Sequence, residues 1–574
     1  MDTIVLNKAK KWLSDGFDSE TRKTVQALID SNSEELTESF YKDLEFGTGG
    51  LRGIMGVGTN RINIYTVGMA TQGLANYLKQ SFSGDISVAI AHDSRNNSPL
   101  FARKTAEVFA ANGIKAYLFD ALRPTPELSF AIRHFGCKSG VVITASHNPK
   151  EYNGYKAYWE DGGQLVAPHD KNVITEVQKI AGPQDVKWNA DESLIETVLE
   201  DIDRAYIAGL KSLCLSPEAV KDQSDLNIVF TSLHGTGGTM VPRTLKELGF
   251  TNVSTVAEQD EPNGNFPTVV SPNPEEAAAL KMALEKAEAI GADLVMGTDP
   301  DADRVGIAVR NLEGKLELLN GNQTATLLIH YLITRWSELG KLDGKQYIAK
   351  TIVTTDLLTR IADAKQVNCY EVLTGFKYIA QLILEKEGRE EFIGGGEESY
   401  GYLAGELVRD KDAVQSCMFI AEMCAWAKNR GKGLYEVLLD IYVEHGMFLE
   451  DLISITKKGK SGAEEIAQMM DRLRNDPPKQ LAGQPLYAVV DYKLGTVTEL
   501  KDGNVSKLNY PKSDVLQFET LDGTVVTARP SGTEPKIKFY FSVNAKLNNK
   551  ADHDAVRGSL KAKITTIQSD LGLK

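Results

Sequence analysis

The chain has 574 residues, with 64 lysines and arginines against 78 aspartates and glutamates, and its formal net charge is −14. This length corresponds to roughly four domains, which can bury several cores without disulfide or metal staples. The composition, 42% hydrophobic and 25% charged, is ordinary for a soluble globular protein. The acidic balance argues against a general nucleic-acid-binding protein, which would carry a basic surface.

The cysteines and the N-terminus indicate the compartment. The five cysteines are scattered and form no CxxC motif, which favours a reducing environment over a disulfide framework. Residues 1–8 lack the basic start and apolar run of a signal peptide. No uncharged apolar stretch approaches the roughly 20 residues that a membrane span needs. We therefore expect a cytoplasmic protein that has no membrane partner.

The first part of the chain, after a helical N-terminal arm, alternates short apolar runs with a helical pattern. Residues 86–91, 114–119 and 141–144 are predicted strands because they are short and mostly apolar. Residues 99–112 are predicted to form a helix, with a proline in its first turn and a glycine just beyond its end. Strands separated by helices of this length indicate βαβ units and a parallel sheet.

The loop TASHNP, residues 144–149, follows the third of these strands. Ligands of open parallel sheets bind beyond the carboxyl ends of the strands, so this loop is a candidate site. Ser146 is a candidate nucleophile or phosphate carrier, and His147 could move a proton or orient the hydroxyl. The flanking positions where the GxSxG elbow of a hydrolase needs glycine hold Thr144 and Asn148, which excludes that motif. Taken alone, a Ser-His pair after a strand is more often a turn or a helix cap.

The strand–helix alternation recurs twice. A second unit has predicted strands at 227–230 and 293–297 and predicted helices at 240–249 and 274–290. The third unit contains predicted helices 324–339, from 356 onward and 378–387, and predicted strands 347–353 and 392–393.

The loop DPDADR follows the second strand of the second unit, and its carboxylates at Asp299, Asp301 and Asp303 can converge on one hard cation. A solvated acidic turn is the ordinary alternative. An EF-hand is excluded, because Arg304 and Arg310 stand where that motif needs glycine and glutamate. Three negative charges on one short loop are costly without a cation. Three side-chain ligands leave room for water and a phosphate oxygen, which suits Mg²⁺.

The loop GGGEESYG, residues 394–401, follows the last strand of the third unit. Its glycines allow a ligand to approach the backbone closely. Glu397 offers a carboxylate for paired sugar hydroxyls, and Ser399 offers a hydroxyl. Such a loop on its own is more often a tight turn.

The last part of the chain has another character. Residues 486–491 and 515–519 are predicted strands, 521–524 a hairpin turn and 537–543 a half-buried strand, and a helix begins near residue 551. We therefore expect a smaller, antiparallel α+β domain. Its loop RPSGTEPK, residues 529–536, offers an arginine, two hydroxyls and a glycine backbone, which could cradle an anion or form a simple turn.

Together and in this order, the four loops resemble those of the α-D-phosphohexomutase superfamily, and most closely those of its phosphoglucomutases. TASHNP resembles the phosphoserine loop, DPDADR the magnesium loop, GEESYG the sugar-binding loop and RPSGTEP the phosphate-binding loop. Further matches are GTGGLRG at 47–53, NGYK at 153–156 and RDKD at 409–412. The resemblance extends from about residue 40 to the end of the chain.

The resemblance implies an α/β fold of three similar α/β domains with mixed, mostly parallel sheets and a smaller C-terminal α+β domain, arranged around a central cleft. The expected divisions are residues 1–205 with the phosphoserine loop, 206–320 with the metal-binding loop, 321–445 with the sugar-binding loop and 446–574 with the phosphate-binding loop.

The resemblance also implies an isomerase of glucose metabolism, a phosphoglucomutase that interconverts α-D-glucose 1-phosphate and α-D-glucose 6-phosphate. Its phosphoserine would be Ser146, and one Mg²⁺ per chain would be held by Ser146 with Asp299, Asp301 and Asp303. Glucose 1,6-bisphosphate would be both intermediate and activator. The expected partners are small-molecule sugar phosphates, for a chain that is a monomer or a weak homo-oligomer.

The remaining roles follow from the same resemblance. Arg52, Lys156 and Arg304 would neutralise the transferring group, and the proton would move through His147, Lys156 or Lys411, among which the sequence does not choose. The expected substrate-binding residues are Glu397, Ser399, Thr374, Gly375, Arg529, Ser531, Gly532 and Thr533.

One departure and several alternatives stay open. Phe376 stands where some family members have a histidine, and it cannot shuttle a proton. The run SHNPKEYNGYK also resembles relatives that act on pentose phosphates or make glucose 1,6-bisphosphate. The alternatives in the superfamily are therefore a phosphomannomutase, a phosphopentomutase and a glucose-1,6-bisphosphate synthase. From other classes come a metal-dependent sugar phosphatase and a catalytically silent sugar-phosphate-binding protein.

Overall fold

The computed structural model describes residues 3–46, 50–457, 459–531 and 535–573. Two compact units make up the chain. The first comprises Met1–Asn320, Phe376–Phe392 and Ser399–Gly431, and the second comprises Gly321–Gly375, Ile393–Glu398 and Lys432–Lys574. No helix of the described residues is both long and apolar enough to cross a membrane.

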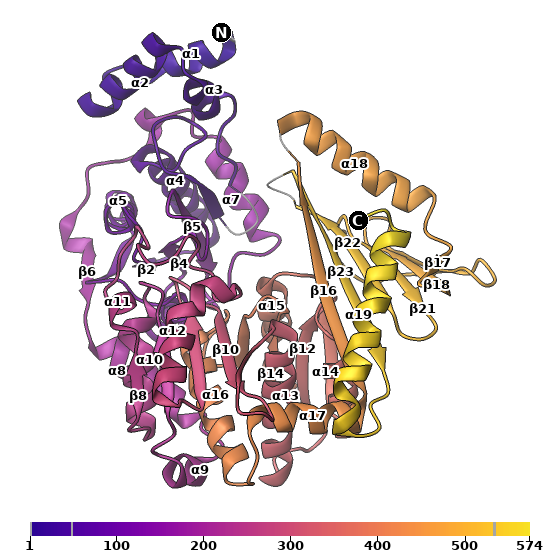
Figure 1. The fold of residues 1–574 in the computed structure, drawn as a ribbon. Coiled ribbons are helices and arrows are strands. Elements are labelled where there is room, and N and C mark those ends of the chain that lie inside the picture. The colour runs from indigo at the N-terminus through magenta and orange to yellow at the C-terminus, as the bar shows by residue number, and fades with distance from the viewer. Residues whose placement is uncertain (1–2, 47–49, 458, 532–534, 574) are drawn as a thin grey trace. The chain divides into compact units, whose positions relative to one another are not determined.

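The first unit begins with the expected helical arm, which consists of α1 (Thr3–Lys11), α2 (Ser19–Ser31) and α3 (Glu34–Phe40) (Figure 1). Trp12 is the centre of its core. The indole ring lies 4.5 Å from the ring of Phe17, 5.7 Å from that of Phe40 and 5.6 Å from that of Tyr65, measured between centroids. Because Tyr65 belongs to helix α4 (Ile64–Ser81), this aromatic cluster attaches the arm to the first α/β domain.

The first sheet has six strands in the order β1-β5-β4-β2-β3-β6. Its parallel centre is β4-β2-β3-β6, whereas β5 and β1 pair antiparallel at one side. The strands are β1 (Gly50–Ile54), β2 (Ser87–His92), β3 (Lys115–Phe119), β4 (Ser139–Ile143), β5 (Tyr152–Trp159) and β6 (Ile195–Val198). The accompanying helices are α4 (Ile64–Ser81), α5 (Ser98–Ala111), α6 (Thr125–Phe135), α7 (His169–Gln178), α8 (Asp201–Ser212) and α9 (Pro217–Asp222).

The second sheet has the order β11-β10-β9-β7-β8, with β8, β7 and β9 parallel and β10 and β11 antiparallel. Its strands are β7 (Ile228–Thr231), β8 (Val253–Thr255), β9 (Leu294–Thr298), β10 (Val305–Arg310) and β11 (Leu316–Leu319). Its helices are α10 (Gly237–Leu248), α11 (Ala257–Asp260) and α12 (Ala277–Ile290). The acidic loop therefore connects two neighbouring strands, and both of its ends are held by the sheet.

The third sheet has the order β13-β12-β14-β15, in which β12 and β13 are parallel. Its strands are β12 (Gln346–Thr351), β13 (Asn368–Val372), β14 (Glu391–Gly396) and β15 (Tyr402–Ala404). The helices of this region are α13 (Gly321–Glu338), α14 (Leu357–Ala364), α15 (Phe376–Lys386), α16 (Ala413–Lys428) and α17 (Leu434–His445).

The C-terminal part of the second unit is an antiparallel sheet in the order β16-β23-β22-β21-β18-β19-β20, with β17 paired to β18. Its strands are β16 (Met447–Thr456), β17 (Gln480–Leu481), β18 (Gln484–Asp491), β19 (Thr496–Glu499), β20 (Val505–Lys507), β21 (Leu516–Thr520), β22 (Val525–Pro530) and β23 (Lys536–Ala545). Helix α18 (Gly459–Asn475) precedes β17, and α19 (His553–Asp570) packs against β16 and β23.

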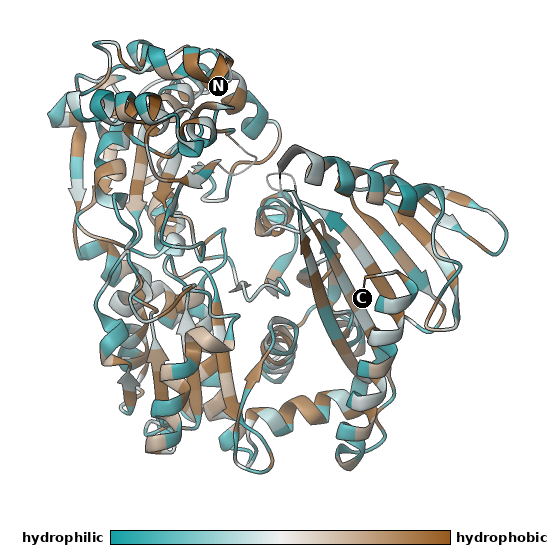
Figure 2. Cartoon of the chain, turned by 45° about the horizontal axis from the view of Figure 1, so that its top comes forward, coloured by the Kyte–Doolittle hydropathy of each residue, from teal (hydrophilic) through white to brown (hydrophobic). Residues whose placement is uncertain are grey.

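The strands are mostly hydrophobic, whereas many of the outer helices carry both hydrophilic and hydrophobic residues (Figure 2). This is the pattern of sheets covered by amphipathic helices. Three α/β domains with mixed sheets and a C-terminal antiparallel domain confirm the predicted fold class. The divisions after residues 205, 320 and 445 remain a prediction, as does the central cleft.

Candidate active site

The predicted serine loop brings Ser146 to the acidic loop of the second α/β domain. Ser146 is 3% exposed and has a φ of 50°, in the left-handed region that only a few non-glycine residues adopt. Its Oγ donates a hydrogen bond of 2.6 Å to Oδ2 of Asp299 and lies 3.2 Å from Nδ1 of His147. Two loops that are 153 residues apart in the sequence thus meet at one hydroxyl.

The three aspartates of the acidic loop are buried side by side. One carboxylate oxygen from each of Asp299, Asp301 and Asp303 lies within 4.8 Å of the other two. Burial, and then repulsion by Asp301 and Asp303, raises the pKa of Asp299 well above its usual value. The positive charge around the three aspartates is therefore too small to keep all three carboxylates ionised at no cost.

Two buried lysines supply part of that charge. Lys156 Nζ lies 2.7 Å from Oδ2 of Asp301 and 3.1 Å from Oδ2 of Asp303, and Lys411 Nζ lies 3.2 Å from the same Asp303 oxygen. Burial alone would raise the pKa of Asp303, but the two ammonium groups outweigh it and lower that pKa. Burial would likewise lower the pKa of Lys156, but Asp301 and Asp303 raise it. Each lysine thus stays paired with the carboxylates.

The position of Lys156 follows from the sheet. Strand β5 lies between β4 and β1, and Lys156 pairs in register with Val142 of β4. The neighbouring Gly154 is required by space, because a Cβ there would lie 2.4 Å from the carbonyl oxygen of Thr144. The motif NGYK therefore lets the serine loop lie directly against β5.

The aspartates fit a divalent cation. Oδ1 of Asp301 and Oδ1 of Asp303 are buried and make no hydrogen bond, although a buried carboxylate oxygen normally has a partner. Carboxylate oxygens are the ligands that hard divalent cations prefer. The three side chains, with the hydroxyl of Ser146 beside them, therefore form a candidate metal site.

Three further predicted residues border this centre. Burial, and then the cations of Arg304 and Arg52, lowers the pKa of His147 well below its usual value, which favours the neutral imidazole. Arg304 Nη1 lies 2.6 Å from Oε1 of Glu275, and Arg52 Nη1 donates to Oδ1 of Asn148 at 3.1 Å. Both guanidinium groups therefore lie near enough to His147 to disfavour a positive charge on its ring.

The predicted sugar-binding loop is held in the second unit. Glu397 is 4% exposed, and its Oε1 accepts a hydrogen bond of 2.9 Å from the backbone N–H of Gly375. The two segments predicted to bind the sugar, 374–375 and 397–399, are therefore joined directly, although Ser399 itself belongs to the first unit. Arg529 lies on β22. The backbone N–H of Ser531 donates to the carbonyl of Lys536, whereas Gly532 and Thr533 lie outside the described residues.

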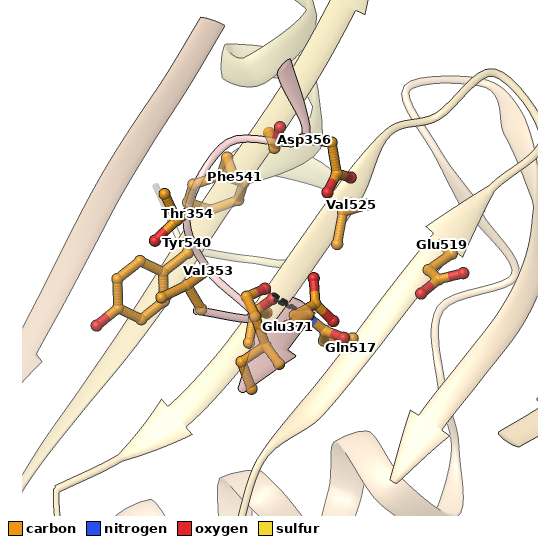
Figure 3. Close-up of a pocket in the computed structure, with 12 residues that line it drawn as sticks. Val353, Thr354, Asp356, Glu371, Gln517, Glu519, Val525, Tyr540 and Phe541 are labelled. Atoms are coloured by element: carbon orange, nitrogen blue, oxygen red, sulfur yellow. Dashed lines mark hydrogen bonds between the residues drawn. The ribbon is translucent and has the colours of Figure 1, made fainter. Parts of the chain in front are cut away.

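A cavity of about 70 Å³ lies beside this loop, between the segment after β12 and one face of β21, β22 and β23 (Figure 3). Gln517 crosses it, and its Nε2 donates to the carbonyl of Ile352 at 2.8 Å. The carboxylates of Asp356 and Glu371 both contact Nζ of Lys350, at 2.9 and 2.5 Å. Thr354 lines the cavity and its Oγ1 lies 3.4 Å from Oε2 of Glu398. The cavity is therefore a polar extension of the sugar-loop region.

Three family models match the chain in series. They are described as phosphoglucomutase/phosphomannomutase alpha/beta/alpha domains I, II and III, and they match residues 43–183, 204–314 and 320–444. A phosphoglucomutase of Staphylococcus epidermidis is 40% identical over 516 residues, which are 89% of this chain and 93% of the relative. A phosphoglucomutase of Staphylococcus aureus is 37% identical over 533 residues, 92% of this chain and 94% of the relative.

The chain belongs to the phosphoglucomutase/phosphomannomutase family. This confirms the resemblance to the α-D-phosphohexomutase superfamily. Two solved structures share the fold. A putative phosphomannomutase of Thermus thermophilus superposes with a TM-score of 0.68 at 22% identity, over 92% of this chain and 98% of that one. The parafusin phosphoglucomutase of Paramecium, in its open form, superposes with a TM-score of 0.69 at 18% identity, over 93% and 96%.

Two residues that position the site through hydrogen bonds were not predicted from the sequence. Thr125 donates from its hydroxyl to Oδ2 of Asp301 and from its backbone N–H to the carbonyl of Asp301, both at 2.9 Å. Arg95 donates to the carbonyl of Ser146 at 2.5 Å. Both follow parallel strands, β3 and β2, whose carboxyl ends share an edge with that of β4. Within the first domain, only the end of the strand at 141–144 was considered, and inspection of the other strand ends there would have found them.

The second unit yields a prediction of pH dependence. Burial, and then the charge of Glu397, raises the pKa of Glu398 from 4.5 to about 7. The folded protein thus favours the neutral carboxyl. This preference stabilises the fold fully below about pH 4.5, and the stabilisation is lost as the pH rises through about 7. We expect the unfolding temperature of the wild type, compared with that of Glu398→Gln, to fall as the pH rises from about 4.5 to about 7. Scanning calorimetry at a series of pH values measures the shift.

The matched control is Asp502→Asn, which changes an exposed carboxylate in a turn of the same unit. Its difference from the wild type should stay nearly constant over the same window. A constant difference for Glu398→Gln as well would contradict the assignment.

Proposed function

We propose that the protein interconverts α-D-glucose 1-phosphate and α-D-glucose 6-phosphate through a phosphoserine enzyme and a glucose 1,6-bisphosphate intermediate. One observation carries the proposal: the hydroxyl of Ser146 is hydrogen-bonded to a cluster of three buried aspartates that can hold a metal ion. The names of the bacterial relatives support the choice of glucose phosphate over mannose and pentose phosphates.

Ser146 is the phosphate carrier in this proposal. In the first half-reaction, the bond between phosphorus and the serine oxygen breaks while the free hydroxyl of the sugar monophosphate bonds to phosphorus and gives up its proton. The bisphosphate then turns over in the site. In the second half-reaction, its other phosphoryl group returns to Ser146, and the oxygen that it leaves takes up a proton.

One Mg²⁺ per chain would be held by Asp299, Asp301 and Asp303 together with the phosphate of Ser146. When bound, it supplies charge stabilisation for the transferring phosphoryl group. Phosphoryl transfer depends mainly on positioning and on such stabilisation. The chain's own cations, Lys156, Arg304 and Arg52, would serve the same purpose.

The proton of the attacking hydroxyl needs an acceptor nearby. His147 has the most direct geometry, because its Nδ1 lies 3.2 Å from the serine Oγ. Lys156 and Lys411 are the other two candidates, and both contact Asp303. A group that serves as base in one half-reaction must serve as acid in the other, because the two half-reactions are the reverse of each other.

The rest of the sugar phosphate would be bound by the remaining predicted residues. Glu397, Ser399, Thr374 and Gly375 would bind hydroxyls that both orientations of the sugar share. Arg529 and the loop 531–533 would hold the phosphate that is not reacting. We further propose the four-domain division given above and a monomer or weak homo-oligomer. The five free cysteines fit the proposed cytoplasmic location.

The decisive experiment is a coupled mutase assay with glucose, mannose and ribose 1-phosphates, each with and without Mg²⁺ and a trace of glucose 1,6-bisphosphate. We expect Mg²⁺-dependent formation of the 6-phosphate to be fastest with glucose. Preference for mannose or ribose would identify one of the related mutases. Accumulation of free phosphate in place of isomer would identify a phosphatase, and no turnover of any sugar would favour a binding protein.

Ser146→Ala removes the proposed phosphate carrier. We expect kcat to fall by about 10⁴-fold or more, because a covalent route loses its only acceptor. Intact-mass measurement after incubation with glucose 1,6-bisphosphate should show one phosphoryl group on the wild type and none on the variant. Ser193→Ala, which removes an exposed hydroxyl, should keep both properties. Equal covalent phosphate on Ser146→Ala and on the wild type would refute the assignment.

Asp301→Asn removes one charge from the proposed metal site. We expect the dissociation constant for Mg²⁺ to rise by about 100-fold, since even loss of an outer partner of a ligand typically costs 10- to 100-fold. Calorimetric titration measures binding, and a titration of activity with Mg²⁺ gives a second reading. Glu313→Gln, in the exposed turn between β10 and β11, is the control. An unchanged titration for Asp301→Asn would exclude a metal at this cluster.

A further inference from the structure

Arg95 lies on the loop after β2 and is 1% exposed. Among the described residues, its guanidinium donates to backbone carbonyls of the serine loop and of the first residue of β5, besides its ion pair with Asp93. Nη1 donates to the carbonyls of Pro149 at 2.8 Å and Tyr152 at 3.0 Å, and Nη2 donates to those of Ser146 at 2.5 Å and Asn148. One side chain thus serves four carbonyl groups within residues 146–152.

The four carbonyl acceptors of this segment favour arginine over lysine. The carbonyl of Ser146 is buried with its bond to Arg95, and a buried carbonyl without a donor is costly. The bonds to Asn148, Pro149 and Tyr152 are partly buried, and the Pro149 carbonyl also accepts from the Tyr152 N–H at 3.0 Å. A guanidinium presents its N–H groups in a rigid planar fork, whereas a lysine ammonium has only three and holds no fixed plane. The loop also contains Ser146 at a φ of 50°, a conformation that persists only when its surroundings over-determine it.

The fork is itself held from two sides. Nε of Arg95 lies 3.2 Å from Oδ2 of Asp93, whose Oδ1 accepts hydrogen bonds from the Arg95 backbone N–H at 2.9 Å and from Ser98 Oγ at 2.7 Å. The ring of Phe266, from the second α/β domain, lies 5.1 Å from the guanidinium carbon. The guanidinium therefore has little freedom to move away from the loop.

We propose that Arg95 is a positioning residue that holds the loop 146–152 so that the Ser146 hydroxyl stays beside Asp299. The catalytic consequence rests on the proposed function, in which Ser146 carries the phosphate. Arg95 acts only through backbone carbonyls and touches no reacting atom. Its loss should therefore slow phosphoryl transfer and leave sugar-phosphate binding nearly unchanged, and a misplacement of about 1 Å can cost about 100-fold in rate.

The test compares Arg95→Lys with Arg310→Lys in the full-length protein. Arg95→Lys keeps a cation beside Asp93 but cannot serve four carbonyls. Arg310 is the matched control, because it also donates to three backbone carbonyls and pairs with a carboxylate, but outside the serine loop. Hydrogen exchange of the peptide 144–152, followed by mass spectrometry, should be faster in Arg95→Lys and unchanged in Arg310→Lys. Unchanged exchange in Arg95→Lys would overturn the proposal whatever the activity.

The activity measurement then tests the catalytic consequence. We expect Arg95→Lys to lower kcat by about 100-fold, with KM for glucose 1-phosphate within about threefold of the wild type. Phosphorylation of Ser146 by glucose 1,6-bisphosphate should slow to the same degree. A raised KM with unchanged kcat, or a loss of kcat equal to that of Arg310→Lys, would overturn the positioning role. If the wild type neither turned over sugar phosphates nor took up phosphate, the proposed function would fail, and the exchange result would still decide whether Arg95 holds the loop.

Discussion

The first unit depends on the compensation of three buried negative charges. Asp299, Asp301 and Asp303 share a space in which each repels the others, and burial makes that repulsion costly. Lys156 and Lys411 compensate part of this charge, and they come from segments more than 100 residues away on either side of the acidic loop. The attraction therefore ties the serine-bearing sheet, the acidic loop and the segment before α16 into one centre.

The mixed sheets make this convergence possible. If β5 had joined the first sheet as another parallel strand, a long crossover would have separated Lys156 from the serine loop. As an antiparallel neighbour of β4, it needs only the short loop 144–151, and that loop carries Ser146. The second sheet uses the same device, because β10 returns directly beside β9 and fixes the acidic loop at both ends. In both domains, two neighbouring antiparallel strands are joined by a short loop that the sheet holds at both ends. A parallel crossover would need a longer connection.

The buried parallel strands and the four loops could be predicted from the sequence, because uninterrupted apolar runs and unusual polar clusters are local signals. Strand β5 could not, since Tyr152–Trp159 mixes aromatic, glycine and polar residues and lacks such a run. Thr125 and Arg95 were missed for another reason: their partners are a carboxylate and backbone carbonyls that only the strand order brings near. The cavity beside the sugar loop arises from side chains of five strands and loops, and no single stretch of sequence encodes it.

The charges of the site also explain why an acidic protein can handle phosphate. Three carboxylates and the two lysines Lys156 and Lys411 sum to −1, which agrees with the raised pKa of Asp299. A bound divalent cation changes that sum to +1, and a phosphoserine, which carries about −1.5 to −2 charges, brings it to about −0.5 to −1. With the phosphate but no metal the sum would be about −2.5 to −3, so the metal removes most of the repulsion that the phosphate would meet. Asp299, Asp301 and Asp303 therefore make binding of the metal and of the phosphoryl group favour each other, and the net charge of −14 has little influence on this balance.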